Sequence, residues 1–559
     1  LNSRGTALEV GDSAGDGVDD VVIGGTTVDA AHWLRGSVNG HWKEQGGLPV
    51  AHDGTLADGP VLIFDADGDG AADILITKSD DGLLAGSSGY QPTLLLNDKH
   101  GQFRSASEGA LPSLPISTGA LAAGDFNRDG RVDLFIGGRL LPGQYPQTPR
   151  SALLVNRGGR FEDVTDGLAP GLSEIGMVTS ALWTDVNGDG WPDLLLTLDW
   201  GGVRCFLNHE GGNFEDAGER LGFAKGGAGW WTSLAAADFN GDGRLDYVVG
   251  NLGLNTPYHA SAAFPALLFS GDFKGDGSTQ LIDAYYESEK LYPWRTRRTF
   301  GSVIPSLLKK YPQNDAYARA TIAQIFGEDK IAAALRFSAT QLSSGVFLSQ
   351  PDGSWRFAAL PRIAQVAPIQ GVVAGDFDGD GCADIYVLHN SSAPIPTIGR
   401  FDGGLSQFLR GDGHGHFTTV PISESGLMVS GDAKGLAQLD FDGDGWPDFV
   451  ATRNNSSAMA FRNRGVTGRH SMRISLRGRT GNLTGVGAQI RVESVSGKIQ
   501  VAELSAGSGY FSQSSAACFF GCANGELPLK IQVRWPDGRS TTSEVTTAIS
   551  HLLMSEDER

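Results

Sequence analysis

The stretch from residue 376 to 384, Asp-Phe-Asp-Gly-Asp-Gly-Cys-Ala-Asp, places carboxylates at loop positions 1, 3, 5 and 9 and glycine at position 6. Apolar residues flank the loop on both sides, which predicts that one strand enters it and another leaves it. Oxygen ligands at these positions converge when a glycine permits a sharp turn, and hard oxygen ligands suit Ca²⁺. The stretch therefore predicts a calcium-binding turn between two strands.

The same loop recurs along most of the chain, sometimes with Asn at the third position. A lone Asp-Gly turn can use its carboxylate merely to accept backbone N–H bonds, but seven copies in register favour several Ca²⁺ ions with a mainly structural role. The first copy has Ala14 where a ligand is expected, so we expect it to bind more weakly. The predicted ligands are Asp12, Asp16 and Asp20; Asp65, Asp67, Asp69 and Asp73; Asp125, Asn127, Asp129 and Asp133; Asp185, Asn187, Asp189 and Asp193; Asp238, Asn240, Asp242 and Asp246; Asp376, Asp378, Asp380 and Asp384; and Asp440, Asp442, Asp444 and Asp448.

Most loops are followed by a short apolar hairpin, such as residues 93–97 (TLLLN) with 101–103 (GQF). Each repeat is thus four short strands, and repeats of this kind are typical of propeller blades. The sequence predicts an all-β fold: a seven-bladed β-propeller over residues 1–465, with eight blades as the alternative. The alternative arises from a poor loop at Asp272, which has Lys274 at a ligand position and which we interpret as a metal-free hairpin turn inside blade five.

The regular spacing is interrupted between the fifth and sixth complete loops. Over residues 311–335 the apolar positions Ala318, Ile322, Ile325 and Phe326 follow helical spacing. This pattern predicts a small helical insertion at about residues 295–335. A basic stretch leads into it, and we interpret this stretch as either a solvated face or an anion-binding lid.

Three motifs follow in order near the C-terminus: residues 485–488 (GVGA), 506–514 (AGSGYFSQS) and 533–538 (VRWPDG). The repeated Asp/Gly loops described above resemble the FG-GAP (VCBS-type) repeats of integrin-α-like propellers. Residues 229–255 resemble bacterial relatives of cartilage acidic protein. The ordered trio resembles the ASPIC/UnbV domain that ends those proteins, although Phe519 stands where that family commonly has His. The resemblance implies calcium binding, a C-terminal β-sandwich-like domain over residues 466–559, and an extracellular binding or adhesion role.

The balance of 64 acidic against 44 basic residues gives a net charge of −20, so most of the surface would repel nucleic acid and anionic membranes. No apolar run approaches the roughly 18 residues of a membrane span. No signal peptide is visible, and an extracellular or periplasmic location rests on the resemblance.

Two functions remain open. The first is a calcium-stabilised binding or adhesion module for a protein or glycan partner. The second is a propeller enzyme, for example a cyclase or another enzyme that transforms a small molecule in the central channel. A filled channel would favour the module over the enzyme. Candidate residues at the channel mouth opposite the calcium loops are Met177, Trp230, Trp231, Gln365, Gln370, Asp432 and Lys434, together with Arg295, Arg297 and Arg298 of the insertion.

Overall fold

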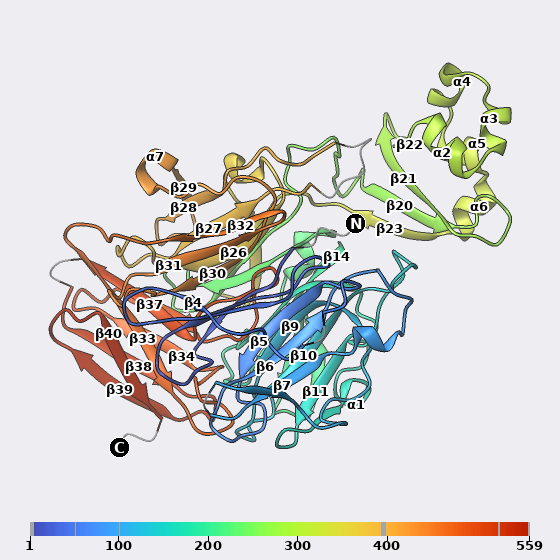
Figure 1. Ribbon diagram of the computed structural model, residues 1–559. Coiled ribbons are helices and arrows are strands. Elements are labelled where there is room, and N and C mark those ends of the chain that lie inside the picture. The colour runs from blue at the N-terminus through green and yellow to red at the C-terminus, as the bar shows by residue number, and fades with distance from the viewer. Residues whose placement is uncertain (1–4, 51, 100, 393–398, 524–525, 557–559) are drawn as a thin grey trace.

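The computed structural model describes residues 5–50, 52–99, 101–392, 399–523 and 526–556, and most of its elements are strands (Figure 1). Within these ranges, strand pairing before residue 462 defines seven antiparallel units around the ring, numbered here in chain order, and a separate sheet in the insertion. The units contain β1 (Leu8–Gly11), β2 (Asp20–Ile23), β3 (His32–Arg35) and β4 (Lys43–Glu44); β5 (Asp58–Phe64), β6 (Asp73–Lys78), β7 (Thr93–Asn97) and β8 (Phe103–Ser105); β9 (Ser117–Gly124), β10 (Asp133–Leu140), β11 (Ala152–Asn156) and β12 (Phe161–Asp163); β13 (Met177–Thr184), β14 (Asp193–Gly201), β15 (Val203–His209) and β16 (Asn213–Asp216); β18 (Leu234–Ala237), β19 (Asp246–Val249), β24 (Gly345–Ser349) and β25 (Trp355–Ala359); β26 (Ile369–Gly375), β27 (Asp384–His389), β28 (Gln407–Gly411) and β29 (Phe417–Val420); and β30 (Ala433–Leu439), β31 (Asp448–Arg453) and β32 (Ser456–Phe461).

The first strands of the units form a closed ring. Each packs against the first strand of the next unit, from β1 through β5, β9, β13, β18 and β26 to β30, which returns to β1. The apolar residues of each sheet pack against the neighbouring sheet, as Leu8 and Val10 of unit 1 do against Ala437 and Leu439 of unit 7. The core is therefore a series of layers between adjacent sheets, as expected for a propeller.

The core of unit 6 includes His389, at the end of β27. Its side chain is buried, its Nε2 lies 3.3 Å from the carbonyl oxygen of Ala364, and its Nδ1 has no hydrogen-bond partner among the described residues. Burial disfavours the imidazolium and lowers the pKa of His389 to about 4.

We expect His389 to make the free energy of unfolding depend on pH. The pKa of the folded state lies below that of the unfolded state, so the stabilisation is complete above about pH 6.5 and is lost as the pH falls towards 4, by about 3 kcal/mol. The measurement is urea unfolding across this range for the wild type and for His389→Gln, which should lack this part of the pH dependence. Identical slopes for the two proteins would contradict the assignment.

The insertion differs from the sequence-based expectation. It lies between β19 and β24, the second and third strands of unit 5, and it contains its own sheet in the order β22-β21-β20-β23. The Asp272 turn joins β20 to β21 of that sheet, so the assignment of this hairpin to blade five was wrong. The sheet strands are β20 (Ala266–Gly271), β21 (Gln280–Glu287), β22 (Lys290–Pro293) and β23 (Leu335–Ala339).

Five short helices complete the described insertion and lie at its far end from the ring (Figure 1). They are α2 (Arg297–Val303), α3 (Ser306–Lys310), α4 (Asn314–Ala318), α5 (Ile322–Phe326) and α6 (Glu328–Ala333). The expected burial holds for Ile322, Ile325 and Phe326, whereas Ala318 is exposed because the helix ends there and the chain turns. Other short helices are α1 (Thr165–Leu168) and α7 (Ile422–Ser425). No helix among the described residues has the length and apolarity needed to cross a membrane.

The C-terminal region forms two facing sheets, β37-β33-β40 and β35-β34-β38-β39, which enclose a shared apolar core. Figure 1 shows this domain on the side of the ring away from the insertion. Its strands are β33 (Arg469–Arg477), β34 (Gln489–Glu493), β35 (Ile499–Glu503), β36 (Ser512–Gln513), β37 (Ala517–Ala523), β38 (Leu529–Arg534), β39 (Ser540–Val545) and β40 (His551–Ser555).

A segment of the C-terminal domain, residues 505–515, enters the ring and is called the plug here. It pairs with inner strands of several units: β36 is parallel to β1, and Ala506 bridges to Ala123 of β9. The Gly509 carbonyl accepts a hydrogen bond of 2.7 Å from the Ser180 hydroxyl of β13. Gly507 is required here, because its φ is +84° and a Cβ would lie 2.1 Å from the carbonyl oxygen of Leu121. The plug therefore fills part of the central channel with the chain's own residues.

Candidate functional site: the calcium loops and the opposite face

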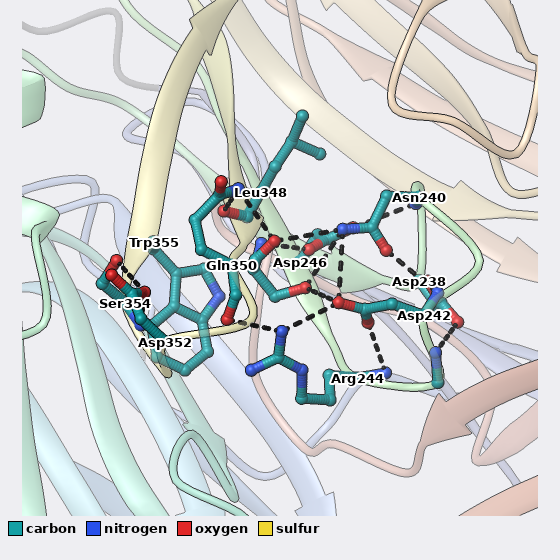
Figure 2. Close-up of polar contacts among 12 residues, drawn as sticks. Asp238, Asn240, Asp242, Arg244, Asp246, Leu348, Gln350, Asp352, Ser354 and Trp355 are labelled. Carbon is teal, nitrogen blue, oxygen red and sulfur yellow. Dashed lines mark hydrogen bonds and ion pairs between the residues drawn. The ribbon is translucent and has the colours of Figure 1, made fainter.

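Each predicted loop joins the first strand of a unit to its second, and the loop of unit 5 illustrates the geometry (Figure 2). The Asp238 carboxylate accepts hydrogen bonds of 2.8 Å from the backbone N–H of Gly241 and of Gly243. The Asp242 carboxylate accepts from Arg244 at 2.9 Å and from the Ser349 hydroxyl at 2.6 Å. These contacts fold the chain tightly around the side-chain oxygens.

The carboxylates converge as expected at positions 1, 3 and 9. In three loops, one oxygen of each of these residues lies within 4.8 Å of the others. The position 5 residue lies outside these groups; in unit 6, for example, Asp380 accepts a hydrogen bond from the N–H of Cys382. Where Asn stands at position 3, the loop has fewer carboxylates to gather. The three groups are Asp65, Asp67 and Asp73; Asp376, Asp378 and Asp384; and Asp440, Asp442 and Asp448.

The electrostatics of the loops favour a cation bound among their carboxylates. Burial, with a smaller contribution from carboxylates of the same loop, raises the pKa of Asp133, Asp193 and Asp448 to about 8. Asp133 Oδ2 and Asp185 Oδ1 are buried without a hydrogen-bond partner in the described chain. Buried acceptors of this kind are costly unless paired. A closely spaced set of carboxylate and carbonyl oxygens fits Ca²⁺, which takes six to eight oxygen ligands.

An asparagine at the end of the third strand ties neighbouring units together, and sequence reasoning assigned it no role. In unit 4 the Asn208 N–H donates to Asp193 at 2.7 Å, while its side-chain amide donates to the carbonyl of Phe126, in the loop of unit 3, at 2.8 Å. The signal in the sequence is the Asn at the end of the apolar hairpin strand in several repeats. Equivalent contacts to the preceding unit come from Asn97, Asn156 and Asn463.

We expect Asn208→Ala to lower the free energy of unfolding by about 1–3 kcal/mol, because it leaves the buried carbonyl of Phe126 without its donor. The matched control is Asn213→Ala, since Asn213 lies in the same hairpin but is exposed. Urea unfolding of both variants checks the effect. Equal stabilities of the two variants would show that the hydrogen bond from Asn208 to Phe126 contributes nothing to the free energy of unfolding.

The C-terminal domain covers the face of the ring that carries the loops. The N–H of Gly481 donates to Asp65 at 2.9 Å, and Arg534 pairs with Asp185 at 2.6 Å. Similar contacts reach the loops of units 1, 6 and 7: Arg473 to Asp19, Arg469 to Asp378, and His551 to Asp440. The loops are therefore part of a domain interface.

Among the predicted channel-mouth residues, three charged ones are paired: Asp432 and Lys434 form a buried ion pair of 2.7 Å, and Arg295 pairs with Asp283 at 2.7 Å. Trp230 is half-buried. Met177, Trp231, Gln365 and Gln370 are instead buried among structural contacts, such as the hydrogen bonds of Gln365 to the backbone of Ser344.

The arginines of the helical insertion do not reach the channel. Arg297 donates to Asn314 and to the carbonyl of Tyr311 within the insertion, and Arg298 is exposed on the same helix. The insertion follows β19, the second strand of unit 5. Because β19 begins at the predicted calcium loop, the insertion that follows its other end lies at the opposite face of the ring.

Four half-buried aromatic residues connect the ring to the insertion at this opposite face and are called the aromatic cluster here. The ring centroids of Trp200 and Trp230 lie 4.8 Å apart, those of Trp230 and Tyr258 5.2 Å, and those of Tyr258 and Trp294 5.0 Å. Only Trp230 of the four was a sequence candidate. Charged pairs accompany the cluster: Arg139 with Asp199, and Arg295 with Asp283.

Comparison with protein families confirms the resemblance seen in the sequence. The FG-GAP-like repeat matches residues 185–249 and 336–387, and the ASPIC and UnbV family matches residues 478–559. The chain thus carries FG-GAP-like repeats followed by an ASPIC and UnbV domain.

Among curated proteins, the chain is similar to cartilage acidic protein 1. It is 26% identical to the Mus musculus protein over 212 residues, which cover 36% of this chain and 32% of that relative. It is 24% identical to the Homo sapiens protein over 212 residues, covering 36% and 31%. The chain therefore spans about a third of the length of the relatives it matches.

Solved structures give weaker similarity. Sqt1 of Saccharomyces cerevisiae has a TM-score of 0.38 at 12% identity, with 98% of both chains covered. The exotype rhamnogalacturonan lyase YesX has a TM-score of 0.30 at 11% identity, with 92% of this chain and 91% of that chain covered. At these scores neither protein informs the function of this one.

Proposed function

We propose that this protein is an extracellular or periplasmic adhesion-type module, stabilised by calcium, that recognises a protein or glycan partner through the face opposite its calcium loops. The observation that carries the proposal is the position of the C-terminal domain. It covers the calcium loops through contacts such as Arg534 to Asp185, which leaves the opposite face for a partner. Similarity to cartilage acidic protein 1 supports the adhesion-type role.

The aromatic cluster is the proposed centre of recognition. Tyr and Trp combine a large apolar surface with a polar edge and are enriched at binding interfaces. In the cluster, Trp200 donates to the Tyr145 hydroxyl at 2.6 Å, so its ring is held in place before a partner arrives. The Arg139–Asp199 pair beside it adds charged groups that can give specificity. The plug occupies part of the channel, which supports a binding surface over a channel enzyme.

The test is binding of the purified protein to arrays of glycans and of secreted proteins, with Trp230→Ala as the variant. Trp230 is half-buried, so we expect at least a tenfold loss of binding with a modest change in melting. Val38→Ala, at a 79% exposed residue between β3 and β4 on the calcium-loop side of unit 1, is the control and should bind normally. The proposal fails if the wild type binds no component of either array, or if Trp230→Ala binds as well as the wild type.

A further inference from the structure

A cavity of about 470 Å³ lies between the C-terminal domain and the inner strands of units 5 and 6 and is called the junction cavity here. On the ring side it is lined by small residues, including Ala236 of β18 and Ala374 and Gly375 of β26. On the other side it is lined by residues of β35, β37 and the plug, including Glu503 and Phe519. It lies on the calcium-loop side of the ring, away from the aromatic cluster.

The cavity lies beside the plug. Backbone contacts join the plug to β1, β9 and β18, through Ser512 to Leu8, Ala506 to Ala123 and Gly509 to Leu234, and the cavity lies next to these contacts on the calcium-loop side. The inner strands of units 5 and 6 present alanine and glycine there, so no side chain fills the remaining space. Protein interiors are normally packed closely, with few voids larger than a water molecule.

Polar groups face this cavity without partners. The side chains of Gln438, Ser505 and Ser508 line it, are only partly buried, and make no hydrogen bond to any residue that the structure describes. Polar groups inside a protein are almost always paired with protein, water or ligand. One water molecule occupies about 30 Å³ of liquid volume, whereas ligand sites span about 300–1,000 Å³. The cavity has the size of a ligand site.

An entrance exists at the side of the molecule. Exposed residues of two turns also line the cavity: His414, in the β28–β29 hairpin of unit 6, and Gly497, in the turn before β35. A small molecule can therefore enter between unit 6 and the C-terminal domain without passing through the filled channel.

We propose that the junction cavity binds a small uncharged polyhydroxylated molecule of monosaccharide size. The unpaired amide and hydroxyl groups can both donate to and accept from ligand hydroxyls, while Phe519 and the alanines provide apolar contact. Lys498 also lines the cavity and donates to the Asp380 carbonyl at 2.6 Å, while the carboxylates of Asp376 and Glu503 on the same lining disfavour an anion. An apolar ligand would leave the polar groups unpaired.

The test uses saturation-transfer NMR on the full chain with D-glucose, D-galactose, D-mannose and N-acetyl-D-glucosamine, each at about 10 mM, a concentration that detects millimolar Kd values. Ser505→Leu fills the cavity and removes a hydroxyl, and Gln438→Ala removes the amide. We expect at least one saccharide to bind the wild type and each variant to weaken it at least tenfold. Ser107→Leu, at an exposed serine far from the cavity, is the matched control and should leave binding unchanged.

The proposal is overturned if no saccharide binds the wild type, or if both variants bind as the wild type does. If Ser505→Leu fails to fold by circular dichroism, Gln438→Ala alone decides the outcome. Since this cavity and the aromatic cluster lie on opposite faces, Trp230→Ala should not alter saccharide binding, which separates this inference from the proposed function.

Discussion

Removal of calcium with EGTA is expected to lower the free energy of unfolding by more than about 5 kcal/mol. A ligand that binds only the folded state at one hundred times its Kd contributes about 2.7 kcal/mol per site, and three loops already gather three carboxylates each. The measurement is thermal and urea unfolding with excess calcium and with EGTA. Unchanged melting would contradict the calcium assignment of every loop.

Two variants separate specific binding from a general effect of charge. Asp378→Ala removes a ligand from a complete loop and should reduce the calcium-dependent part of stability. Asp272→Ala changes the first position of the poor loop, where Lys274 pairs with Asp276 at 2.5 Å, and should leave that part unchanged. If the two variants respond to calcium equally, the loop pattern does not determine the binding sites.

Trp231→Ala is expected to lower the free energy of unfolding by about 3–5 kcal/mol, the usual range for truncating a large core aromatic. Trp231 is 0% exposed, contacts the ring of Phe357 edge-on at 5.9 Å, and donates from Nε1 to the carbonyl of Gly227. Trp231 thus belongs to the apolar core between units 4 and 5. Urea unfolding measures the change.

Trp230→Ala is the matched comparison, because the two residues are adjacent and identical in type. Trp230 is half-buried, so its loss should cost less, below about 2 kcal/mol. Equal destabilisation by the two substitutions would mean that the separation into a core and a surface tryptophan is wrong.

The repeated elements of this fold could be predicted from the sequence because each is specified by residues close together in the chain. The loop from Asp376 to Asp384 contains its ligands, its glycine and its flanking strands within a few residues, and the structure gathers Asp376, Asp378 and Asp384 as expected. The apolar hairpins were equally clear. What these signals share is short range: each depends on residues that are neighbours in the sequence.

The features that the sequence did not reveal depend on distant contacts. Residues 266–293 have the apolar pattern of a blade hairpin, and only the pairing of β19 with β24, across the whole insertion, shows that they belong elsewhere. The aromatic cluster joins Trp200 of unit 4 to Trp294 of the insertion through two intermediate rings. No periodicity or motif in the sequence predicts such a contact.

The pairing of β1 with β36 has a consequence for how the chain reaches its native state. It joins Leu8 to Ser512, so the first unit cannot complete its pairing until the C-terminal domain has been synthesised. Contacts between residues this far apart in sequence close slowly, because a long loop must be ordered before they form. Until the plug arrives, the inner strands of a nascent ring expose edges that can pair with other chains. Folding of this protein should therefore be slow and prone to aggregation when synthesis stops before residue 505, and trimming the first strand should impair the completed ring as strongly as deleting the plug.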